Sequence, residues 1–151
     1  MLPWMSDPDW ERETHFLPKN TRSGAKPLTT GEALTVVLLD NDEEIRLVMA
    51  LGLEHHHFRV LQARTPAEAA HFRRNHSTGL LVADVGVLQP QAVEALRPIE
   101  ALQPKIKVLL ISGHDRATVE DRHEGLLTGR EFLQKPFSPL LLATVLQQMA
   151  Q

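Results

Sequence analysis

The chain has 151 residues, of which 42% are hydrophobic and 23% charged, and its formal net charge is -3; these values are typical of one soluble globular domain. Acidic residues outnumber basic ones by 19 to 16, whereas direct nucleic-acid binding calls for a surplus of lysine and arginine, so we expect no direct contact with nucleic acid. Cysteine is absent, which excludes disulfides and thiolate metal sites and makes the cytoplasm the simplest location. Because the sequence shows neither a signal peptide nor an apolar run of membrane-spanning length, we expect no membrane association.

The first part of the chain, residues 1–33, differs in composition from the rest. It mixes prolines, charges and small polar residues with scattered apolar side chains, and it has no sustained helical or strand period. We interpret it as a flexible N-terminal arm, whose Trp4 and Trp10 could dock on the domain or on a partner. Residues 34–151 are assigned to a single folded domain.

Five short apolar runs alternate with helical stretches from Leu34 onward, a pattern typical of repeated βα units around a parallel sheet. The runs are residues 35–39, 58–61, 80–83, 108–111 and 131–134. The first, third and fourth runs are apolar throughout, as strands that are covered on both faces must be. The second and fifth are mixed in composition, which predicts that they form the edges of the sheet.

Helices are expected between these strands and after the last one, near residues 43–54, 66–75, 91–102, 118–127 and 140–149. Thr65-Pro66-Ala67-Glu68 is a typical helix start, with an N-cap hydroxyl, a proline in the first turn and a glutamate that can reach back to the Thr65 amide. Ser138-Pro139 repeats the cap and the proline before the last helix. Pro98 lies inside the third helix and should kink or shorten it.

Joined by right-handed crossovers, these units predict an α/β fold: a doubly wound five-stranded parallel sheet, flavodoxin-like, with strand order 2-1-3-4-5 and helices on both faces. In such sheets, ligands bind beyond the carboxyl ends of the strands, where the order reverses between the first strand and the third. We therefore expect a functional site among the residues that follow the strands.

Polar side chains follow four of the strands at this predicted edge: Asp40, Asp84, Ser112 and Lys135. The two aspartates would supply the hard oxygens that Mg²⁺ accepts while it keeps several waters. A bound cation and the Lys135 ammonium would relieve the repulsion between the carboxylates, and they would also neutralise a phosphoryl group. With Ser112 donating a hydrogen bond to a phosphoryl oxygen, the set is suited to attack by an aspartate on phosphorus, which forms an acyl phosphate.

Four segments together resemble the response-regulator receiver domains of two-component signalling. They are Leu39-Asp40-Asn41-Asp42-Glu43-Glu44-Ile45-Arg46, Leu81-Val82-Ala83-Asp84, Leu110-Ile111-Ser112-Gly113-His114 and Phe132-Leu133-Gln134-Lys135-Pro136-Phe137. The resemblance implies that Asp84 accepts a phosphoryl group from a histidine kinase or a phosphotransfer protein, that Ser112 is the switch hydroxyl and Phe132 the switch aromatic, and that Lys135 binds the phosphoryl group. It also implies a cis peptide bond between Lys135 and Pro136.

The resemblance implies in addition a Mg²⁺ site formed by Asp40, the residue at position 41, Asp84 and the backbone carbonyl of Gly86. Receivers usually carry two consecutive acids after the first strand, whereas the second place is taken here by Asn41. Metal affinity should therefore fall. Asp42 could partly substitute through a water molecule, or it could simply cap the helix that follows.

The loop after Asp84 also departs from the family pattern. Leu88 and Ala92 occupy the places of the usual proline and glycine, while Pro90 is shifted. This loop should therefore differ in shape from that of other receivers.

Three functions can be considered for a chain with these residues. The first is a receiver that accepts phosphate on Asp84 by self-catalysed transfer, without enzymatic turnover, and switches a partner-binding face. The alternative is a degenerate receiver in which Asn41 has abolished useful metal binding and which acts as a phosphorylation-independent interaction module. A haloacid dehalogenase-like phosphatase fits Asp40-Asn41-Asp42, but that chemistry needs a further acid after the lysine, and no Asp or Glu follows Glu131.

Two further runs have structural interpretations. His55-His56-His57 is interpreted as a solvated helix end, because consecutive helical residues point in different directions and cannot easily converge on one ion. Leu140-Leu141-Leu142 overfills a single core stripe. The excess could extend a face made by the last helix and the last strand, which receivers commonly use for homodimers or partners.

Overall fold

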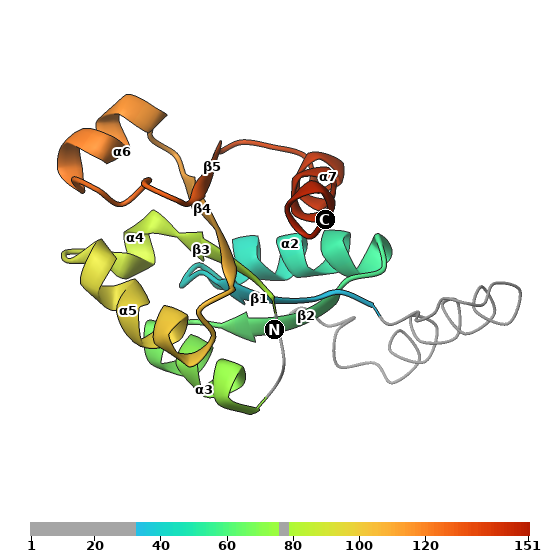
Figure 1. The fold of residues 1–151 in the computed structure, drawn as a ribbon. Coiled ribbons are helices and arrows are strands. Elements are labelled where there is room, and N and C mark those ends of the chain that lie inside the picture. The colour runs from blue at the N-terminus through green and yellow to red at the C-terminus, as the bar shows by residue number, and fades with distance from the viewer. Residues whose placement is uncertain (1–32, 76–78) are drawn as a thin grey trace, which may run out of the picture.

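The computed structural model describes residues 33–75 and 79–151, drawn as a ribbon in Figure 1. Its elements in chain order are β1 (Thr35–Leu39), α2 (Glu43–His55), β2 (Arg59–Ala63), α3 (Pro66–Asn75), β3 (Leu80–Asp84), α4 (Val85–Leu88), α5 (Ala92–Leu102), β4 (Lys107–Ser112), α6 (Arg116–Arg122), β5 (Glu131–Gln134) and α7 (Pro139–Met149). The N-terminal arm predicted at residues 1–33 falls, except for its last residue, outside the described part of the chain.

The strands pair in parallel in the order β2-β1-β3-β4-β5, which confirms the predicted doubly wound sheet. The apolar strands β1, β3 and β4 lie in the centre, and the mixed strands β2 and β5 form the edges. The order reverses between β1 and β3, so the carboxyl ends of these two strands lie side by side. Ligands bind at this position in sheets of this type.

Alternate residues of the central strands point into two hydrophobic cores, one on each face of the sheet. Val36 and Leu38 pack with α2 and α7, whereas Val37 and Leu39 pack with α3 and α5. Figure 1 shows these two pairs of helices on opposite faces of the sheet. Each Val or Leu buried in this way contributes about 1.5–3 kcal/mol relative to an exposed side chain, so the central strands are firmly held.

Two of the helix starts are capped as the sequence predicts, with one correction. The Ser138 hydroxyl accepts a hydrogen bond from the Leu141 N–H at 3.0 Å, and the Thr65 hydroxyl accepts one from the Glu68 N–H at 3.1 Å. The prediction that Glu68 reaches back to the Thr65 amide is wrong. Its carboxylate instead accepts the N–H of Arg64 at 2.7 Å, because the chain approaches α3 with the Arg64 amide turned toward the first turn.

The histidine run closes α2, as a helix-end interpretation predicts. His57 has a φ of 73°, in the left-handed region, and its N–H donates to the Glu54 carbonyl while the Phe58 N–H donates to the Leu53 carbonyl. These two bonds define a Schellman motif. Phe58 is buried against the same core as Leu53, so it ends the helix and β2 begins one residue later than predicted.

Helix α6 lies earlier in the chain than the predicted range 118–127, since it begins at Arg116 and ends at Arg122. The Asp115 carboxylate accepts the Thr118 N–H at 2.8 Å and caps the helix there. After the helix the chain forms successive turns in which Gly125 has a φ of 82°, a conformation that favours glycine.

Two further helices lie between β3 and β4. The short α4 follows β3 directly and was not predicted. Pro98 does not shorten α5, which ends at Leu102 as expected. None of the helices in the described residues has the length and hydropathy needed to traverse a lipid bilayer.

Helix α7 approaches α2 closely at Gly52. A Cβ atom at this position would overlap the Pro139 Cβ and lie 3.0 Å from its Cγ, so the contact requires glycine. Leu142 of α7 is fully buried, whereas Leu140 and Leu141 are 60% and 44% exposed. Three consecutive leucines therefore do not all face the core, which confirms the prediction of an apolar excess on this helix.

Candidate functional site

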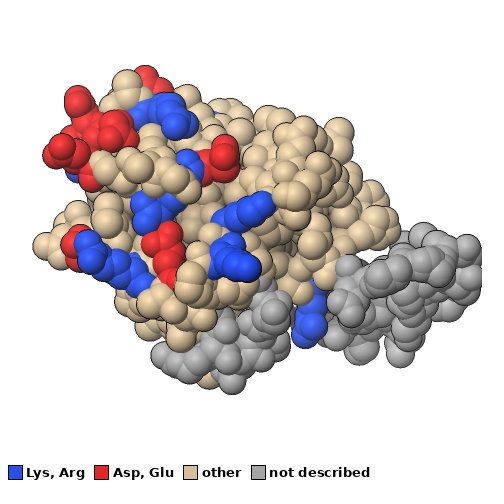
Figure 2. Space-filling view, viewed as in Figure 1, with Lys and Arg blue, Asp and Glu red and all other residues tan. Residues whose placement is uncertain are grey.

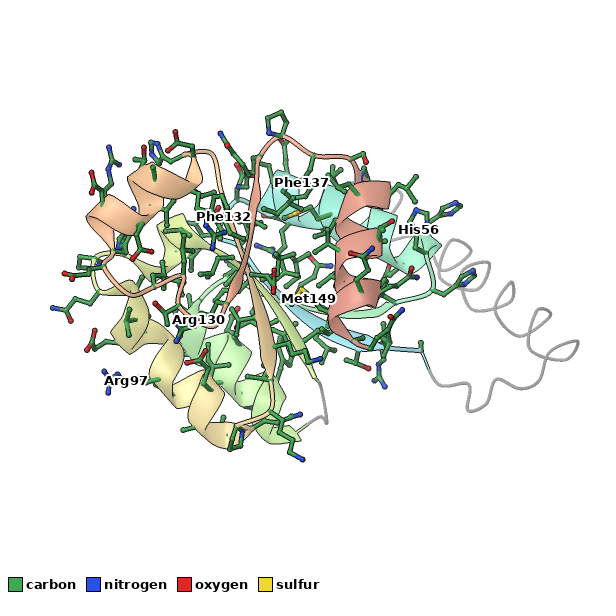
Figure 3. The ribbon with its side chains drawn as sticks, turned by 45° about the horizontal axis from the view of Figure 1, so that its top comes forward. His56, Arg97, Arg130, Phe132, Phe137 and Met149 are labelled. Carbon is green, nitrogen blue, oxygen red and sulfur yellow. The ribbon has the colours of Figure 1, made fainter. Side chains whose placement is uncertain are left out.

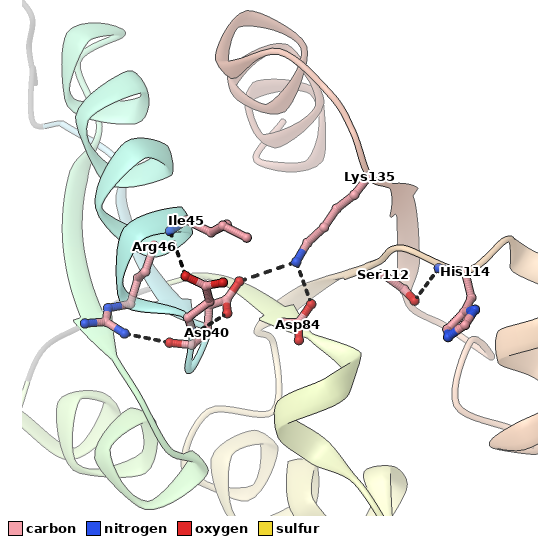
Figure 4. Close-up of polar contacts among 8 residues, drawn as sticks. Asp40, Ile45, Arg46, Asp84, Ser112, His114 and Lys135 are labelled. Carbon is pink, nitrogen blue, oxygen red and sulfur yellow. Dashed lines mark hydrogen bonds and ion pairs between the residues drawn. The ribbon is translucent and has the colours of Figure 1, made fainter.

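The predicted site residues from three strand ends meet at one edge of the sheet (Figure 4). The Lys135 ammonium donates to Asp84 Oδ1 at 2.9 Å and lies 3.6 Å from Asp40 Oδ2. These side chains come from the ends of β5, β3 and β1. One lysine therefore bridges two aspartates that are 44 residues apart in the sequence.

Asp40 is fixed by hydrogen bonds on every side but one. Its N–H donates to the Ala63 carbonyl at 3.1 Å, its own carbonyl accepts from Arg46 Nη1 at 2.7 Å, and Oδ1 accepts the Asp42 N–H at 2.9 Å. Oδ2 is the one buried side-chain oxygen of the described residues that has no hydrogen-bond partner. The backbone and one oxygen are thus held in place while the other oxygen is directed toward Lys135.

Arg46 and Gln62, which support the backbone of Asp40, were not among the predicted site residues. Arg46 is only 6% exposed, and its Nε donates to the Gln62 side-chain oxygen at 3.1 Å. Figure 4 shows its guanidinium turned to the Asp40 carbonyl, away from Lys135. The signal that could have revealed it is the position of Arg46 four residues after the cap residue Asp42, one helical turn into α2.

The charges of the site perturb one another. Burial raises the pKa of Asp40, the hydrogen bond from the Asp42 amide opposes this rise, and the nearby charge of Asp84 adds to it. Burial lowers the pKa of Lys135, but its hydrogen bond to Asp84 and the charges of both aspartates outweigh burial and raise that pKa overall. The ammonium therefore stays charged and compensates the two carboxyl groups.

Asp84 occupies the N-cap position of α4, but its carboxylate makes no capping hydrogen bond and pairs with Lys135 instead. The exposed Gly86 follows two residues later, and a Cβ there would lie 2.8 Å from Asp84 Oδ2. The peptide bond between Lys135 and Pro136 is cis, as the resemblance implies.

Ser112 and Phe132 lie on the β4 and β5 side of this edge. Ser112 is 5% exposed and its Oγ accepts the His114 N–H at 3.0 Å, while its carbonyl accepts the Lys135 N–H at 2.8 Å. Phe132 is half-buried at the position that Figure 3 labels, with the Arg116 guanidinium carbon 6.0 Å from its ring centre. Ser112 is thus joined to Lys135 through the backbone, and its hydroxyl is directed to the turn that follows.

Asn41 and Asp42 are both exposed on the β1 side. The Asp42 carboxylate accepts the Ile45 N–H at 3.2 Å and so caps α2. The capping interpretation of Asp42 is confirmed, and this carboxylate is already engaged in the helix start.

The side chains at this edge of the sheet can hold the Mg²⁺ ion that the sequence implies only with few charged ligands. No group of three His, Cys, Asp or Glu side chains placed to hold a metal occurs in the part of the chain that the structure describes. Asp40 and Asp84 nevertheless offer two carboxylates at adjacent strand ends, and the buried Asp40 Oδ2 lacks a hydrogen bond. Carboxylate oxygens fit a hard cation that completes its shell with water, so the residues fit the ion with fewer charged ligands than a three-acid site provides.

The fold and the site together define a class of signalling domain: a doubly wound five-stranded sheet with two aspartates and a lysine at the β1/β3 switch point. Residues 36–147 match the family model described as the response regulator receiver domain. The chain belongs to this family of two-component signal transduction domains, which are signalling domains and not turnover enzymes.

The chain is also similar to known response regulators and to solved structures of receiver domains. The chain is 29% identical over 109 residues to the response regulator GtcR of Aneurinibacillus migulanus, an alignment that covers 70% of this chain and 43% of that protein. A receiver protein structure from Sinorhizobium medicae has a TM-score of 0.65 at 24% identity and covers 78% of this chain and 94% of its own. A CheY-like receiver from Methanospirillum hungatei has a TM-score of 0.67 at 20% identity, with 78% and 94% covered.

The two solved structures share the fold with this chain. The curated relatives that it matches are longer, since the chain spans between 25% and 57% of their length. The similarity therefore concerns their receiver portions.

Proposed function

We propose that this domain accepts a phosphoryl group on Asp84 from a histidine kinase or a phosphotransfer protein and thereby switches a partner-binding face. The observation that carries the proposal is the Lys135 ammonium, 2.9 Å from Asp84 Oδ1 and 3.6 Å from Asp40 Oδ2. A cation in this place neutralises the acids at rest and would neutralise the oxygens of an incoming phosphoryl group.

Each side chain has a role in this proposal. An Asp84 oxygen attacks phosphorus and forms an acyl phosphate, while the donor nitrogen leaves with the electron pair of the broken P–N bond. Lys135 pairs with one phosphoryl oxygen, and the Ser112 hydroxyl turns from the His114 amide to donate to another. Bound Mg²⁺, held by Asp40, Asp84, the Asn41 position and the Gly86 carbonyl, would supply charge neutralisation and orient the oxygens.

The proposed output is a change around β5 and α7. Ser112 and Phe132 lie on the neighbouring strands β4 and β5, so we expect a rotation of the Ser112 hydroxyl to change the space available to the Phe132 ring. On the opposite face of the sheet, where α7 packs, the exposed Leu141 and the half-buried Phe137 provide apolar surface, which suits a homodimer or another partner. The proposed donor and the absence of cysteine favour a cytoplasmic location.

Amide NMR spectra of the full chain test the proposal directly. Addition of Mg²⁺ and beryllofluoride, a mimic of the phosphoryl group, should shift the amide signals near Ala83, Ser112 and Lys135. Signals that stay unchanged at millimolar concentrations of both reagents would overturn the phosphoacceptor function.

The degenerate-receiver alternative is favoured by one specific observation, namely that Asn41 leaves the site with two carboxylates. Titration of Mg²⁺ into the wild type and into Asn41→Asp tests this alternative. We expect the variant to bind Mg²⁺ roughly tenfold more tightly because a third carboxylate joins the site. Gln147→Glu, which adds the same charge on the exposed face of α7, is the control and should leave affinity unchanged. Equal affinities for all three proteins would show that position 41 does not limit metal binding.

A further inference from the structure

An apolar stripe on α2 continues onto the start of α7. Ile45, Val48 and Gly52 follow one another at intervals of three and four residues, so they lie along one face of α2. Ile45 is 39% exposed and Val48 is 56% exposed, and a Cβ atom at Gly52 would overlap Pro139 of α7. The stripe therefore leads to the first turn of α7.

The first turn of α7 adds two apolar side chains to this stripe. Pro139 is exposed, and so is Leu140, which follows it. Figure 1 shows α2 and α7 beside each other on one face of the sheet. We name Ile45, Val48, Pro139 and Leu140 the α2–α7 patch. Apolar side chains that gather on two elements form a binding surface more readily than the single exposed ones that every soluble domain carries.

The α2–α7 patch is too small to hold a second copy of the chain by itself. It consists of four side chains, whereas a stable interface between two proteins has about 20–30 residues on each side. A segment of the same chain needs less contact, because its covalent linkage gives it an effective concentration of about millimolar. The size of the patch thus favours a segment that is joined to the domain.

The N-terminal arm, residues 1–33, contains side chains that fit such a patch. Trp4 and Trp10 are the two tryptophans of the chain, and tryptophan rings are typical anchors on apolar surfaces. Trp10 precedes Ala33 by 23 positions. A flexible chain of this length spans about 25 Å, whereas a helix of 13 residues such as α2 is about 20 Å long. The arm is therefore long enough to bring Trp10 to any part of α2.

The arm joins the domain near the same helix. The Arg59 N–H donates to the Leu34 carbonyl at 2.8 Å, so the arm is attached beside the start of β2. The last turn of α2 leads directly to this strand, through Phe58, which is buried in the same core as Leu53 of α2. The arm therefore begins next to the C-terminal end of α2.

Charge favours a position along the C-terminal half of α2. The segment around Trp10 is acidic, with four carboxylates and one arginine between residues 7 and 13. Arg59 is exposed where the arm is attached, and it forms no ion pair with any described residue. The exposed Lys107 lies at the start of β4, on the same edge of the sheet. Glu44, exposed in the first turn of α2, would repel the segment from the other end of the helix.

We propose that the N-terminal arm docks through Trp10 on the α2–α7 patch, with its acidic residues toward Arg59, and so covers this face of the domain. The arm then acts as an intramolecular cover, which any partner that binds the face has to displace. The inference is independent of the phosphoacceptor proposal, because Asp84 and Lys135 take no part in it.

Tryptophan fluorescence of the full chain tests the docking, because both tryptophans lie in the arm. We expect the emission of the wild type to be shifted to the blue, and its quenching by acrylamide to be weaker, than for a peptide of residues 1–32. Val48→Glu should abolish the blue shift and raise the quenching constant at least about twofold, since a charge replaces the apolar contact of the ring. Leu102→Glu is the matched control. It changes an exposed leucine of α5, on the other face of the sheet, and should behave like the wild type.

A spin label measures where the arm docks. The chain has no cysteine, so Ser6→Cys provides a single attachment site between Trp4 and Trp10. In NMR spectra the label should broaden the amide signals of Val48 and Leu140 and leave those of α5 sharp.

The possible failures differ from one another and from a failure of phosphorylation. Wild-type emission and quenching equal to those of the peptide would overturn the docking. Protection that persists in Val48→Glu, protection that is lost equally in Leu102→Glu, or broadening on another face would overturn the assignment to the α2–α7 patch. Protection that disappears on dilution would show that a second copy covers the patch, and it would overturn the intramolecular contact.

Discussion

The two halves of the site differ in how firmly they are held. On the β1 and β2 side, Asp40 is fixed through its N–H, its carbonyl and Oδ1 by Ala63, Arg46 and Asp42. On the β4 and β5 side, Ser112 Oγ has a hydrogen bond only two residues along its own chain, and β5 and α6 have 4 and 7 residues. The acidic half is therefore prearranged, whereas the half that carries the proposed switch residues is held by few local contacts.

One ion pair ties the start of β5 to α5. Arg130, just before β5, donates through Nε and Nη2 to the two carboxylate oxygens of Glu100 on α5 at 2.9 and 2.8 Å, and through Nη1 to the Leu126 carbonyl. Figure 2 shows acidic side chains gathered over α6. Besides its pairing with β4, the β5 side thus has a polar anchor to α5.

The largest effect is expected at the firm half. Arg46→Leu leaves the Asp40 carbonyl and the Gln62 side-chain oxygen without this donor, and we expect a loss of about 3 kcal/mol in the free energy of unfolding, measured by urea denaturation. Hydrogen exchange at the Asp42 amide should also accelerate. Arg59→Leu, at an exposed position on β2, is the control, and comparable losses for both would refute a special role for the buried arginine.

A smaller effect is expected from the anchor on the β5 side. A double-mutant cycle with Arg130→Ala and Glu100→Ala should give a coupling energy of about 1.5–2 kcal/mol, because the pair is bidentate and mostly buried. The exposed pair of Arg97 and Glu94, 3.5 Å apart, is the matched comparison, and its coupling should be about 0.5 kcal/mol or less. Figure 3 shows Arg97 at the outside of the molecule and Arg130 closer to the sheet. Equal couplings would contradict the anchoring role.

Asp40→Asn tests how much the buried charge of Asp40 lowers the free energy of unfolding. Because burial raises the Asp40 pKa above its ordinary 3.8, the folded protein binds this proton more tightly than the unfolded chain, and the wild type loses stability as the pH rises through the folded pKa. Asp40→Asn lacks this loss and should be more stable by about 1 kcal/mol at neutral pH, with no gain below the unfolded pKa. Urea denaturation across pH measures it, and a gain that persists at low pH would point to another cause.

The smallest effect is expected for the contact between Arg116 and Phe132. Arg116→Ala should change the free energy of unfolding by about 0.5 kcal/mol or less, since the guanidinium is exposed and lies at the outer limit of a cation–π contact. The ring signals of Phe132 should nevertheless shift in NMR spectra, whereas Arg97→Ala should leave them unchanged. A loss as large as that for Arg46→Leu would show that the β5 side is not loosely held.

Much of the fold could be predicted because short-range patterns determine it. The fully apolar runs identify the three central strands, and strand-end positions in a parallel sheet lie at one edge, so Asp40, Asp84 and Lys135 could be placed together. The cap of α6 at Asp115 was missed because the helix was predicted to begin only at Thr118, whose N–H the Asp115 carboxylate accepts.

The supporting contacts could not be predicted, for a different physical reason. The Arg46 bond to the Asp40 carbonyl and the position of Gly86 over Asp84 depend on the turn that follows each strand. Those turns result from packing across the sheet, which no local sequence pattern records. The site residues could thus be named from the sequence, whereas the contacts that orient them could not.

The close approach of Gly52 and Pro139 has a consequence for how α7 can move. With no side chain between the two helices at this point, the start of α7 has no room to come nearer to α2 or to slide along it without a clash. A displacement that reaches α7 from β5 would then turn the helix about its first turn, and it would act against the contact of the Lys107 ammonium with the Met149 carbonyl at the far end. The C-terminal end of α7 is therefore where we expect a small change at the site to produce the largest displacement.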